Sequence, residues 1–276
     1  MLYIRGGRMM SDTFMAQNRD RDWDKELQDI LGTKDTWSSK TAWDEQILPV
    51  TVKEKIKEIK NLFRENINSL NLNSPKETRQ SGALILRKNK ERTDTGNIDE
   101  TAIEREFVKI WENTYNQFNL LSGIYPDSNM STKAIDLVRT EFVGAQEQIS
   151  ELIELKQAEY LKNPLYAALQ ILYYYLIFDE LEKLGWEAKL ENGRLVPTKT
   201  IINLKVLIPE EYAYGYLDYE LINAIKNAIY DETKMYFDFY TFQQKAIEYI
   251  INDKDGEDRD KYISDFLSRI KKIDKV

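Results

Sequence analysis

The chain contains no cysteine and no histidine among its 276 residues, so its fold must form without disulfides, zinc fingers or iron–sulfur clusters. A hydrophobic fraction of 42% and an aromatic fraction of 12% are sufficient for a buried core. The 11 Gly and 6 Pro residues are few for an all-β sandwich, which needs many turns. We therefore expect a fold held together by apolar packing, mainly between helices.

The same two absences narrow the chemistry that the chain can perform. Without His the usual general base at neutral pH is missing, and without Cys there is no thiol nucleophile. P-loop, dinucleotide-binding and nucleophile-elbow motifs are also absent from the sequence. We expect no catalytic residues, no cofactor and no metal site, and a protein that acts by contact rather than as an enzyme.

Apolar side chains at helical spacing predict most of the secondary structure. Thr51-x-x-Glu54 and Thr101-x-x-Glu104 are capping boxes that open two of the helices. The run at 165–178 is apolar on all sides and predicts a buried central helix. Helices are expected over 51–70, 101–118, 131–161, 164–184, 217–252 and 260–273.

A clear β signal lies between residues 186 and 208, where Asn192-Gly193 is a type I′ hairpin signature. The predicted fold class is mainly α, a multi-helix body with one small β-hairpin or three-stranded sheet at about 186–208. The expected parts are an extended N-terminal arm at 1–48, a helical body at 49–184 with a mobile loop at 71–97, the hairpin insertion at 186–208, and a C-terminal helical segment at 209–276.

Aromatic side chains in polar surroundings favour contact with another protein. Leaving a Trp in water forgoes burial worth roughly 2–3 kcal/mol, so these rings pack either on their own domain or on a neighbouring subunit. Our first hypothesis is a non-catalytic assembly protein, such as a phage or viral connector or tail piece, that forms a homo-oligomer or binds other proteins of an assembly. The interface candidates are Trp23, Trp37, Trp43, Tyr212, Tyr214 and Tyr216.

The segment 76–92 is the most basic local stretch of a chain whose formal net charge is -8. Clustered Lys and Arg in a loop are typical of a contact with a nucleic-acid backbone, and they are equally typical of a solvated loop. The second hypothesis is therefore a nucleic-acid-binding accessory protein. Its candidate contacts are Arg79, Arg87, Lys88, Lys90 and Arg92.

A third hypothesis is a Mg²⁺-dependent phosphodiesterase built on Glu187-Ala188-Lys189, with Asp179 upstream. The Glu-x-Lys tripeptide matches the end of a metal-dependent nuclease core. Such a core needs its acidic residues and Lys on paired strands around Mg²⁺, which activates a water molecule. Asp179, however, falls on a predicted helix. The acidic segment 253–260 fails the EF-hand register and is interpreted as a solvated loop.

No signal peptide is visible, because residues 1–15 carry charged side chains and no apolar stretch. The apolar run at 165–178 is too short to span a bilayer, and no membrane partner is expected. The expected location is the cytoplasm, which would be a host cytoplasm or a virion if the protein is viral.

Overall fold

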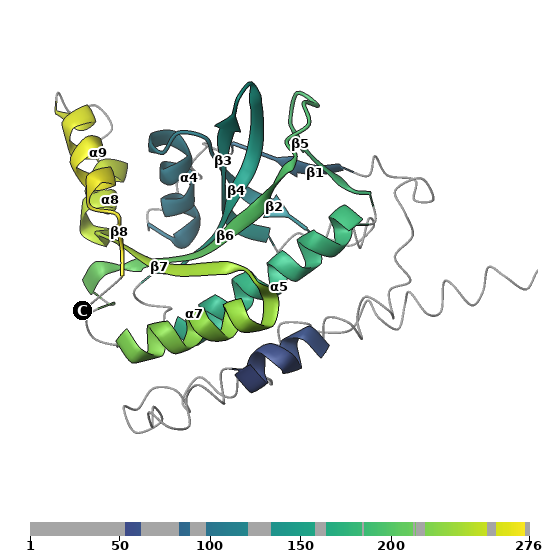
Figure 1. Ribbon diagram of the computed structural model, residues 1–276. Helices are drawn as coiled ribbons and strands as arrows, with labels where there is room; N and C mark the ends of the chain where they lie inside the picture. Colours follow the sequence, from purple (N-terminus) through teal and green to yellow (C-terminus); the bar gives the residue numbers. More distant parts are fainter. Residues whose placement is uncertain are drawn as a thin grey trace, which may run out of the picture.

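The computed structural model describes residues 53–61, 83–88, 98–120, 134–157, 164–183, 185–211, 213, 219–252 and 258–273. Within them, a six-stranded mixed sheet has the order β2-β3-β4-β6-β7-β8, and helices pack on both of its faces (Figure 1). This is an α/β fold. The expectation of a mainly α body with one small hairpin is therefore wrong.

The main sheet is formed by β2 (Thr114–Asn119), β3 (Ala134–Val143), β4 (Gln146–Leu155), β6 (Thr198–Pro209), β7 (Tyr236–Phe242) and β8 (Lys271–Lys272). A separate parallel pair consists of β1 (Ala83–Leu86) and β5 (Glu187–Leu190). The labelled helices are α4 (Glu100–Ile110), α5 (Pro164–Lys183), α7 (Tyr219–Thr233), α8 (Gln244–Asn252) and α9 (Arg259–Ser268), and residues 53–61 are also helical.

Strand directions change in the middle of the sheet. β2, β3 and β4 are joined in antiparallel fashion, whereas β4, β6 and β7 run parallel. The crossovers between the parallel strands contain α5 and α7, as parallel neighbours require. The carboxyl ends of β4, β6 and β7 therefore meet at one edge of the sheet, which is where open α/β sheets bind ligands.

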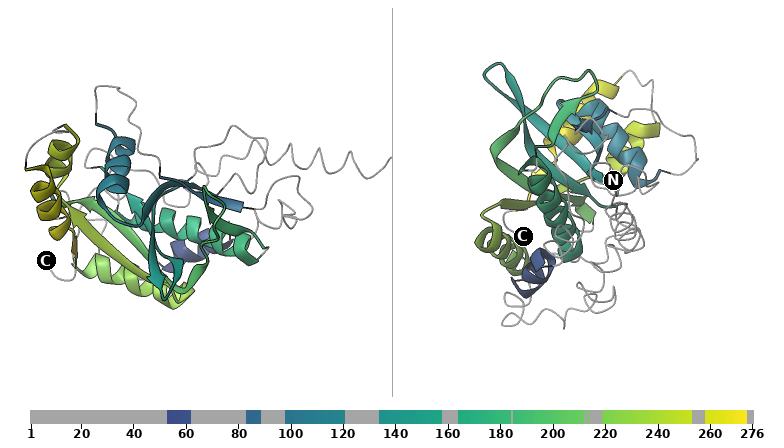
Figure 2. Two further views of the ribbon diagram at one scale, coloured as in Figure 1. Left: turned by 90° about the horizontal axis from the view of Figure 1, so that it is seen from above. Right: turned by 90° about the vertical axis from the view of Figure 1, so that its right-hand side faces the viewer.

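Different helices cover the two faces of the sheet (Figure 2), and each face carries its own hydrophobic core. On one face, α5, α7 and the helical residues 53–61 pack against side chains such as Leu152 and Phe239. On the other face, Phe107 of α4 packs with Leu137, and its ring lies 5.7 Å from that of Phe266 in α9. The packing of Phe107 in this second core holds α4 against β3 and β4.

The predicted helix over 131–161 is wrong, because its described part consists of β3, a turn and β4. Gly144 has a φ of 64° in this turn, a conformation that glycine adopts without strain. Side chains on both faces of these strands are buried, for example Leu137 on one and Val138 on the other. Apolar residues on both faces of a strand can match the three-and-four spacing of a helix as well, so periodicity alone misled the prediction.

Other predictions succeeded in part. The helix over 164–184 is confirmed as α5, and a turn is present at Asn192-Gly193, where Gly193 has a φ of 83°. The predicted type I′ geometry is wrong, because Asn192 does not have the positive φ that it requires. The helix over 101–118 ends early and continues as β2, and the helical stretch over 217–252 is interrupted by β7. Helix 260–273 ends with α9 and is followed by β8.

The predicted N-terminal arm at 1–48 lies outside the described residues, and so does most of the predicted loop at 71–97. Among the helices that are described, none is both long enough and apolar enough to cross a membrane.

Candidate functional site

Four carboxylates and one lysine come together at the carboxyl end of β4. Glu100 and Glu104 come from α4, Asp136 from the start of β3, and Glu154 and Lys156 from the end of β4 and the residue after it. One ligand atom from each of Glu100, Glu104 and Asp136 lies within 4.8 Å of the others. We call these five residues the carboxylate centre.

Local rules explain how α4 contributes two of these carboxylates. The side chain of Asp99 accepts a hydrogen bond from the Ala102 N–H at 2.8 Å and so caps the start of the helix. Residues four apart lie on one side of a helix, which places Glu100 and Glu104 together. Phe107, fully buried below them, fixes the helix on the sheet.

Strand geometry supplies the other members of the centre. Glu154 and Lys156 are two residues apart, so on extended backbone their side chains point to the same side. The Lys156 Nζ lies 2.5 Å from Glu154 Oε1 and 3.8 Å from Glu100 Oε1. Asp136 is tied to the same strand because the Leu155 N–H donates to its Oδ2 at 2.8 Å.

Gln157, which follows Lys156 and is not part of the carboxylate centre, joins the end of β4 to the start of α4. Its side chain is buried, and its Nε2 donates to the carbonyl oxygen of Ile98 at 3.3 Å, just ahead of α4. A backbone hydrogen bond from Gln157 also reaches Glu100. The end of β4 and the start of α4 are therefore joined directly.

Burial and mutual repulsion make these acids hold protons tightly. Burial, followed by the charges of Asp136, Glu100 and Glu154, raises the pKa of Glu104 to about 10. Burial also raises the pKa of Asp136, and burial and the Asp136 charge raise the pKa of Glu154. Burial would lower the pKa of Lys156, but the nearby carboxylates outweigh it and hold that pKa above its usual value.

Two oxygen atoms of the carboxylate centre lack any donor in the described part of the chain. Glu104 Oε2 and Glu154 Oε2 are both buried and have no hydrogen-bond partner. Bulk water cannot supply the missing bond to Glu154, because this residue is fully buried. Leaving such atoms unsatisfied is costly. One lysine cannot neutralise four carboxylates, and oxygen ligands of this kind are those preferred by Mg²⁺, Mn²⁺ and Ca²⁺. The residues present therefore fit a hard divalent cation.

The sequence contains one signal for this site that the sequence analysis did not use. Glu154-Leu155-Lys156 has the same Glu-x-Lys spacing as the tripeptide at 187–189. The predicted helix over 131–161 concealed it, because residues two apart do not share one side of a helix. Asp136 and Glu104 carry no local signal, since only the fold brings them to the end of β4.

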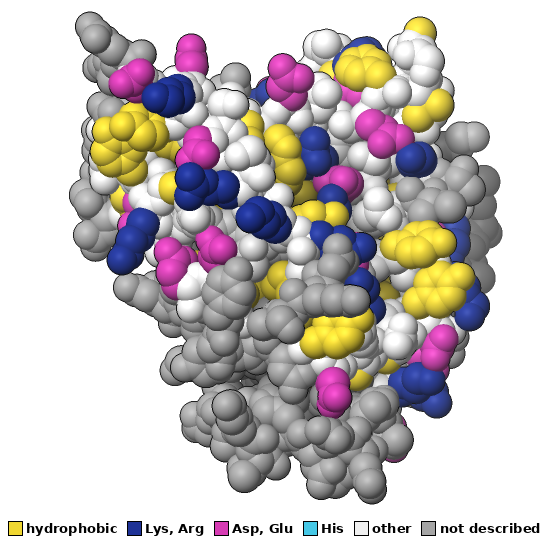
Figure 3. Space-filling model, turned by 60° about the vertical axis from the view of Figure 1, so that its left-hand side comes forward, with side chains coloured by type: hydrophobic (Ala, Val, Ile, Leu, Met, Phe, Trp, Pro, Cys, Tyr) yellow, Lys and Arg dark blue, Asp and Glu magenta, His cyan; other side chains and the backbone are white. Residues whose placement is uncertain are grey.

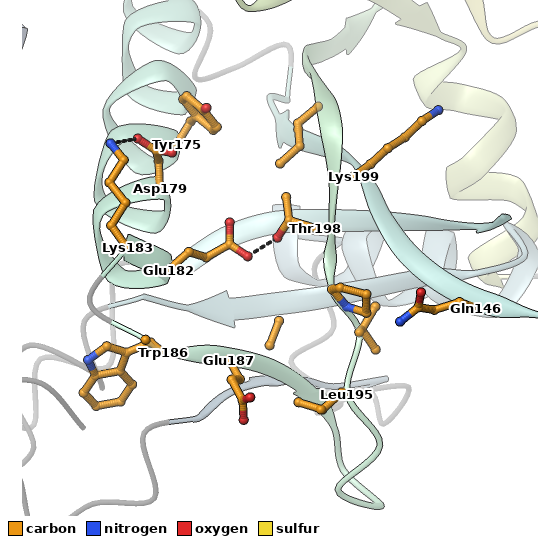
Figure 4. A pocket seen from close by; sticks show the side chains of 15 residues that line it. Gln146, Tyr175, Asp179, Glu182, Lys183, Trp186, Glu187, Leu195, Thr198 and Lys199 are labelled. Carbon is orange, nitrogen blue, oxygen red and sulfur yellow. Dashed lines mark hydrogen bonds and ion pairs between the residues drawn. The ribbon is translucent and has the colours of Figure 1, made fainter. Parts of the chain in front are cut away.

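The predicted acidic site, by contrast, is not assembled. Glu187 and Lys189 lie on β5 and pair with each other at 3.0 Å. Asp179 on α5 pairs with Lys183 at 2.6 Å (Figure 4). Glu187 and Asp179 line a cavity of about 690 Å³ near the amino end of β4. This cavity is at the opposite end of β4 from the carboxylate centre.

Of the predicted nucleic-acid contacts, Arg87 and Lys88 are described, and both are exposed at the end of β1. The Arg87 carbonyl oxygen accepts from the Asn116 N–H at 3.0 Å, and Lys88 Nζ lies 4.9 Å from the ring centre of Tyr115. The remaining predicted contacts and interface residues lie outside the described residues: Arg79, Lys90, Arg92, Trp23, Trp37, Trp43, Tyr212, Tyr214 and Tyr216.

No protein-family model, curated protein or solved structure matches this chain.

Proposed function

We propose that this protein is a divalent-metal-dependent phosphodiesterase that cleaves nucleic acid. The observation that carries the proposal is the ion pair between Glu154, near the end of β4, and Lys156, just after it, with Asp136 of the paired strand β3 bonded to the residue between them. This is the arrangement that a Glu-x-Lys metal-dependent nuclease core requires. Glu104 supports it, because its buried Oε2 has no donor.

Asp136, Glu154 and Glu104 are the residues that would hold the metal ion, with Glu100 beside them. A bound Mg²⁺ or Mn²⁺ supplies a Lewis acid for a phosphoryl oxygen and lowers the pKa of a water molecule. The carboxylates neutralise the ion and fix its position, and the buried surroundings strengthen this attraction. Mg²⁺ typically combines one or two protein carboxylates with substrate phosphates, which matches a phosphodiester substrate.

Lys156 serves as the fixed positive charge of the site. Its raised pKa keeps Nζ protonated at neutral pH, so it is a hydrogen-bond donor and not the general base. Glu154 Oε1, 2.5 Å away, holds the ammonium group in place. From there Nζ donates to a phosphate oxygen, or orients the attacking water, without having to lose its proton.

The exposed cations near the site favour a nucleic acid over a small phosphodiester. Arg87 and Lys88 lie at the β2 edge of the sheet. Asn116, the bridge partner of Arg87, pairs with Leu137, the residue after Asp136. Exposed cations one strand away from the centre are well placed to contact phosphates flanking the one that is cut.

This proposal departs from the expectation of a non-catalytic assembly protein without a metal site. That expectation rested on the Trp and Tyr residues of the arm and of the segment after β6, which lie outside the described residues. Assembly into an oligomer therefore stays a prediction, and it is compatible with catalysis. The third hypothesis is kept in substance, with Glu154 and Lys156 in place of Glu187 and Lys189.

The test compares Glu154→Gln with the matched control Glu187→Gln, since each changes the Glu of one Glu-x-Lys tripeptide. Labelled single-stranded and duplex DNA and RNA are incubated with each protein in Mg²⁺, Mn²⁺ or EDTA. We expect metal-dependent cleavage by the wild type. Loss of an outer partner of a metal ligand typically costs 10–100-fold, so losing Glu154 itself should cost more than about 100-fold. Glu187→Gln should cleave at the wild-type rate.

Calorimetric titration with Mn²⁺ makes the test independent of substrate choice. The wild type and Glu187→Gln should bind the ion, and Glu154→Gln should bind it much more weakly. Wild-type protein that binds the ion but cleaves none of the four substrates would overturn the proposed activity. Full cleavage by Glu154→Gln would remove the site assignment.

A further inference from the structure

A second group of charged and aromatic side chains lies across the sheet on the face covered by α4 and α8. Arg139 of β3 and Lys205 of β6 both pair with Glu151 of β4, at 3.1 Å and 2.5 Å. Glu151 lies two residues from Ile153, which packs against α4 and α8, so the group shares that face. With the rings of Trp111 and Tyr240 at its two ends, we call it the Arg139 strip.

Each cation of the Arg139 strip lies over an aromatic ring. The Arg139 guanidinium carbon is 4.1 Å from the ring centre of Trp111, and Lys205 Nζ is 4.4 Å from that of Tyr240. Both rings are partly exposed. The order across the sheet is therefore ring, cation, carboxylate, cation, ring.

The strip carries more positive than negative charge. Two cations share the single carboxylate of Glu151, and Arg139 Nε is buried without a hydrogen-bond partner. The same pattern recurs one strand along, where Lys226 and Lys272 share Asp238 at 2.6 Å and 2.8 Å. Figure 3 shows Lys and Arg side chains gathering near the middle of the face on this side of the molecule, with hydrophobic side chains among them.

The Arg139 strip lies close to the carboxylate centre. Arg139 is three residues beyond Asp136 on β3, and Glu151 is three residues before Glu154 on β4. At about 3.3 Å per residue, three residues correspond to roughly 10 Å along the strands, but this odd separation turns Glu154 to the face opposite Glu151. The members of the centre on the side of the strip are therefore those of α4, Glu100 and Glu104. Helix α4 spans the same interval, from Glu104 at the centre to Trp111 just after its last residue.

We propose that the Arg139 strip binds a single strand of nucleic acid and holds the nucleotides next to the bond that is cut. This inference rests on the proposed phosphodiesterase activity. Single-stranded nucleic acids are bound by cations that follow the backbone together with aromatic rings on which bases stack, and Arg planes add to this stacking. The bases of an intact duplex are stacked on one another and are not available to Trp111 and Tyr240.

The strip is already ordered before a ligand binds. The Arg139 and Lys205 side chains are only 25% and 11% exposed, and both are held by Glu151. Little side-chain freedom is therefore lost on binding, which favours affinity. Arg139 has five N–H donors, so after its contact with Glu151 it retains donors for a phosphate.

Binding is tested without cleavage, in EDTA, by the fluorescence anisotropy of a labelled single-stranded oligonucleotide and of the matching duplex. Arg139→Gln should weaken single-strand binding about tenfold, the order expected for losing a charge-assisted hydrogen bond. It should also lower the slope of log affinity against log salt by about one. Arg139→Lys keeps the charge and should keep the wild-type salt slope, which shows that the loss in Arg139→Gln is not misfolding.

The matched control is Lys53→Gln. It removes one positive charge from an exposed pair with Asp231, beside α7 on the other side of the sheet. Its affinity should equal that of the wild type. Equal affinities for Arg139→Gln and Lys53→Gln, or tighter binding of duplex than of single strand, would overturn the inference.

The two proposals fail separately. If the wild type cleaves nucleic acid with metal and Arg139→Gln binds single strands normally, the role of the Arg139 strip is rejected and the proposed activity stands. Binding that depends on Arg139, in a protein that cleaves nothing, would keep the strip as a nucleic-acid surface and remove the activity.

Discussion

Acidic side chains gather at both ends of β4, but the two ends differ in how many of these acids have a partner of their own. At the carboxyl end, Glu154 is fully buried among three other carboxylates that share Lys156. At the amino end, the cavity is also lined by acids, but each has its own partner. Asp179 pairs with Lys183, Glu187 with Lys189, and Glu182 accepts a hydrogen bond from the Thr198 hydroxyl.

This difference indicates which end needs a ligand. The acids around the cavity are satisfied by the protein itself, and Glu187, with 53% of its side chain exposed, is also solvated. The carboxylate centre holds four acids with raised pKa values around one lysine, and two of its buried oxygens have no hydrogen-bond partner among the described residues. Buried charges without partners are unfavourable, so a cation at the carboxyl end would relieve a cost that does not exist at the amino end.

The largest expected difference between the two ends of β4 is in the rate of cleavage after replacement of Lys156 at one end or Lys189 at the other. Lys156→Met should lower the rate of metal-dependent cleavage by about 10²–10³-fold, the usual cost of removing one fixed donor that stabilises the charge of the transition state. Mn²⁺ affinity, measured by calorimetry, should stay the same or rise, because a competing cation has been removed. Lys189→Met is the control and should cleave normally. Equal rates for the two variants would contradict the assignment of Lys156.

A second prediction concerns how the stability of the protein depends on pH. The titratable groups that face one another in the carboxylate centre are Glu100, Glu104, Asp136, Glu154 and Lys156. Glu104 has a pKa of 4.5 in the unfolded chain and about 10 in the fold. The folded apoprotein thus binds this proton more tightly. The resulting stability is complete below pH 4.5 and is lost as the pH rises toward about 10. Lys156 changes the stability only at pH values above 10.5, its ordinary pKa, because its pKa in the fold is higher still. It therefore does not contribute to the change between pH 4.5 and about 10.

Metal ions bind the ionised carboxylates, so their effect should grow over the same pH window. At a concentration 100 times its Kd, an ion that binds only the folded state stabilises it by about 2.7 kcal/mol. Thermal unfolding should therefore show a gap between Mg²⁺ and EDTA that widens as the pH rises. Glu154→Gln should narrow this gap. Parallel curves at all pH values would speak against a metal site made of these acids.

The smallest effect distinguishes two buried glutamates on α4. Glu104 faces other carboxylates, whereas Glu106 pairs with Lys109 at 2.9 Å and with Arg259 of α9 at 2.6 Å. In EDTA near neutral pH, Glu104→Gln should stabilise the protein by about 1 kcal/mol, because it removes the cost of keeping this carboxyl protonated in the fold. Glu106→Gln should destabilise it by about 1–3 kcal/mol, because it weakens two charge-assisted bonds. Urea unfolding measures both, and a destabilised Glu104→Gln would contradict the raised pKa of Glu104.

Sequence reasoning succeeded where the signal is local. The helix from Pro164 and the turn at Gly193 follow from a helix-starting Pro, a run of apolar side chains and a glycine with positive φ. It failed at β3 and β4, because strands buried on both faces show no clean alternation. It also missed β7, a strand of seven residues that does alternate but lies between two helices. Strands β3 and β4 hold or align the carboxylate centre, so the error in fold also concealed which residues meet there.

The sequence by itself determined the kind of chemistry that is open to this protein. With no His and no Cys, a metal site must be made of oxygen ligands. The Glu-x-Lys spacing occurs four times in the chain, at 58–60, 154–156, 187–189 and 232–234, and the sequence alone favoured 187–189. Only the tertiary structure separates 154–156 from 187–189. It places Glu154 at the end of β4 and Lys156 just after it, with Asp136 bonded to the residue between them, and it gives Glu187 to an exposed pair. The physical reason is that a metal site depends on charges that meet in space and on their burial, and spacing along the chain specifies neither.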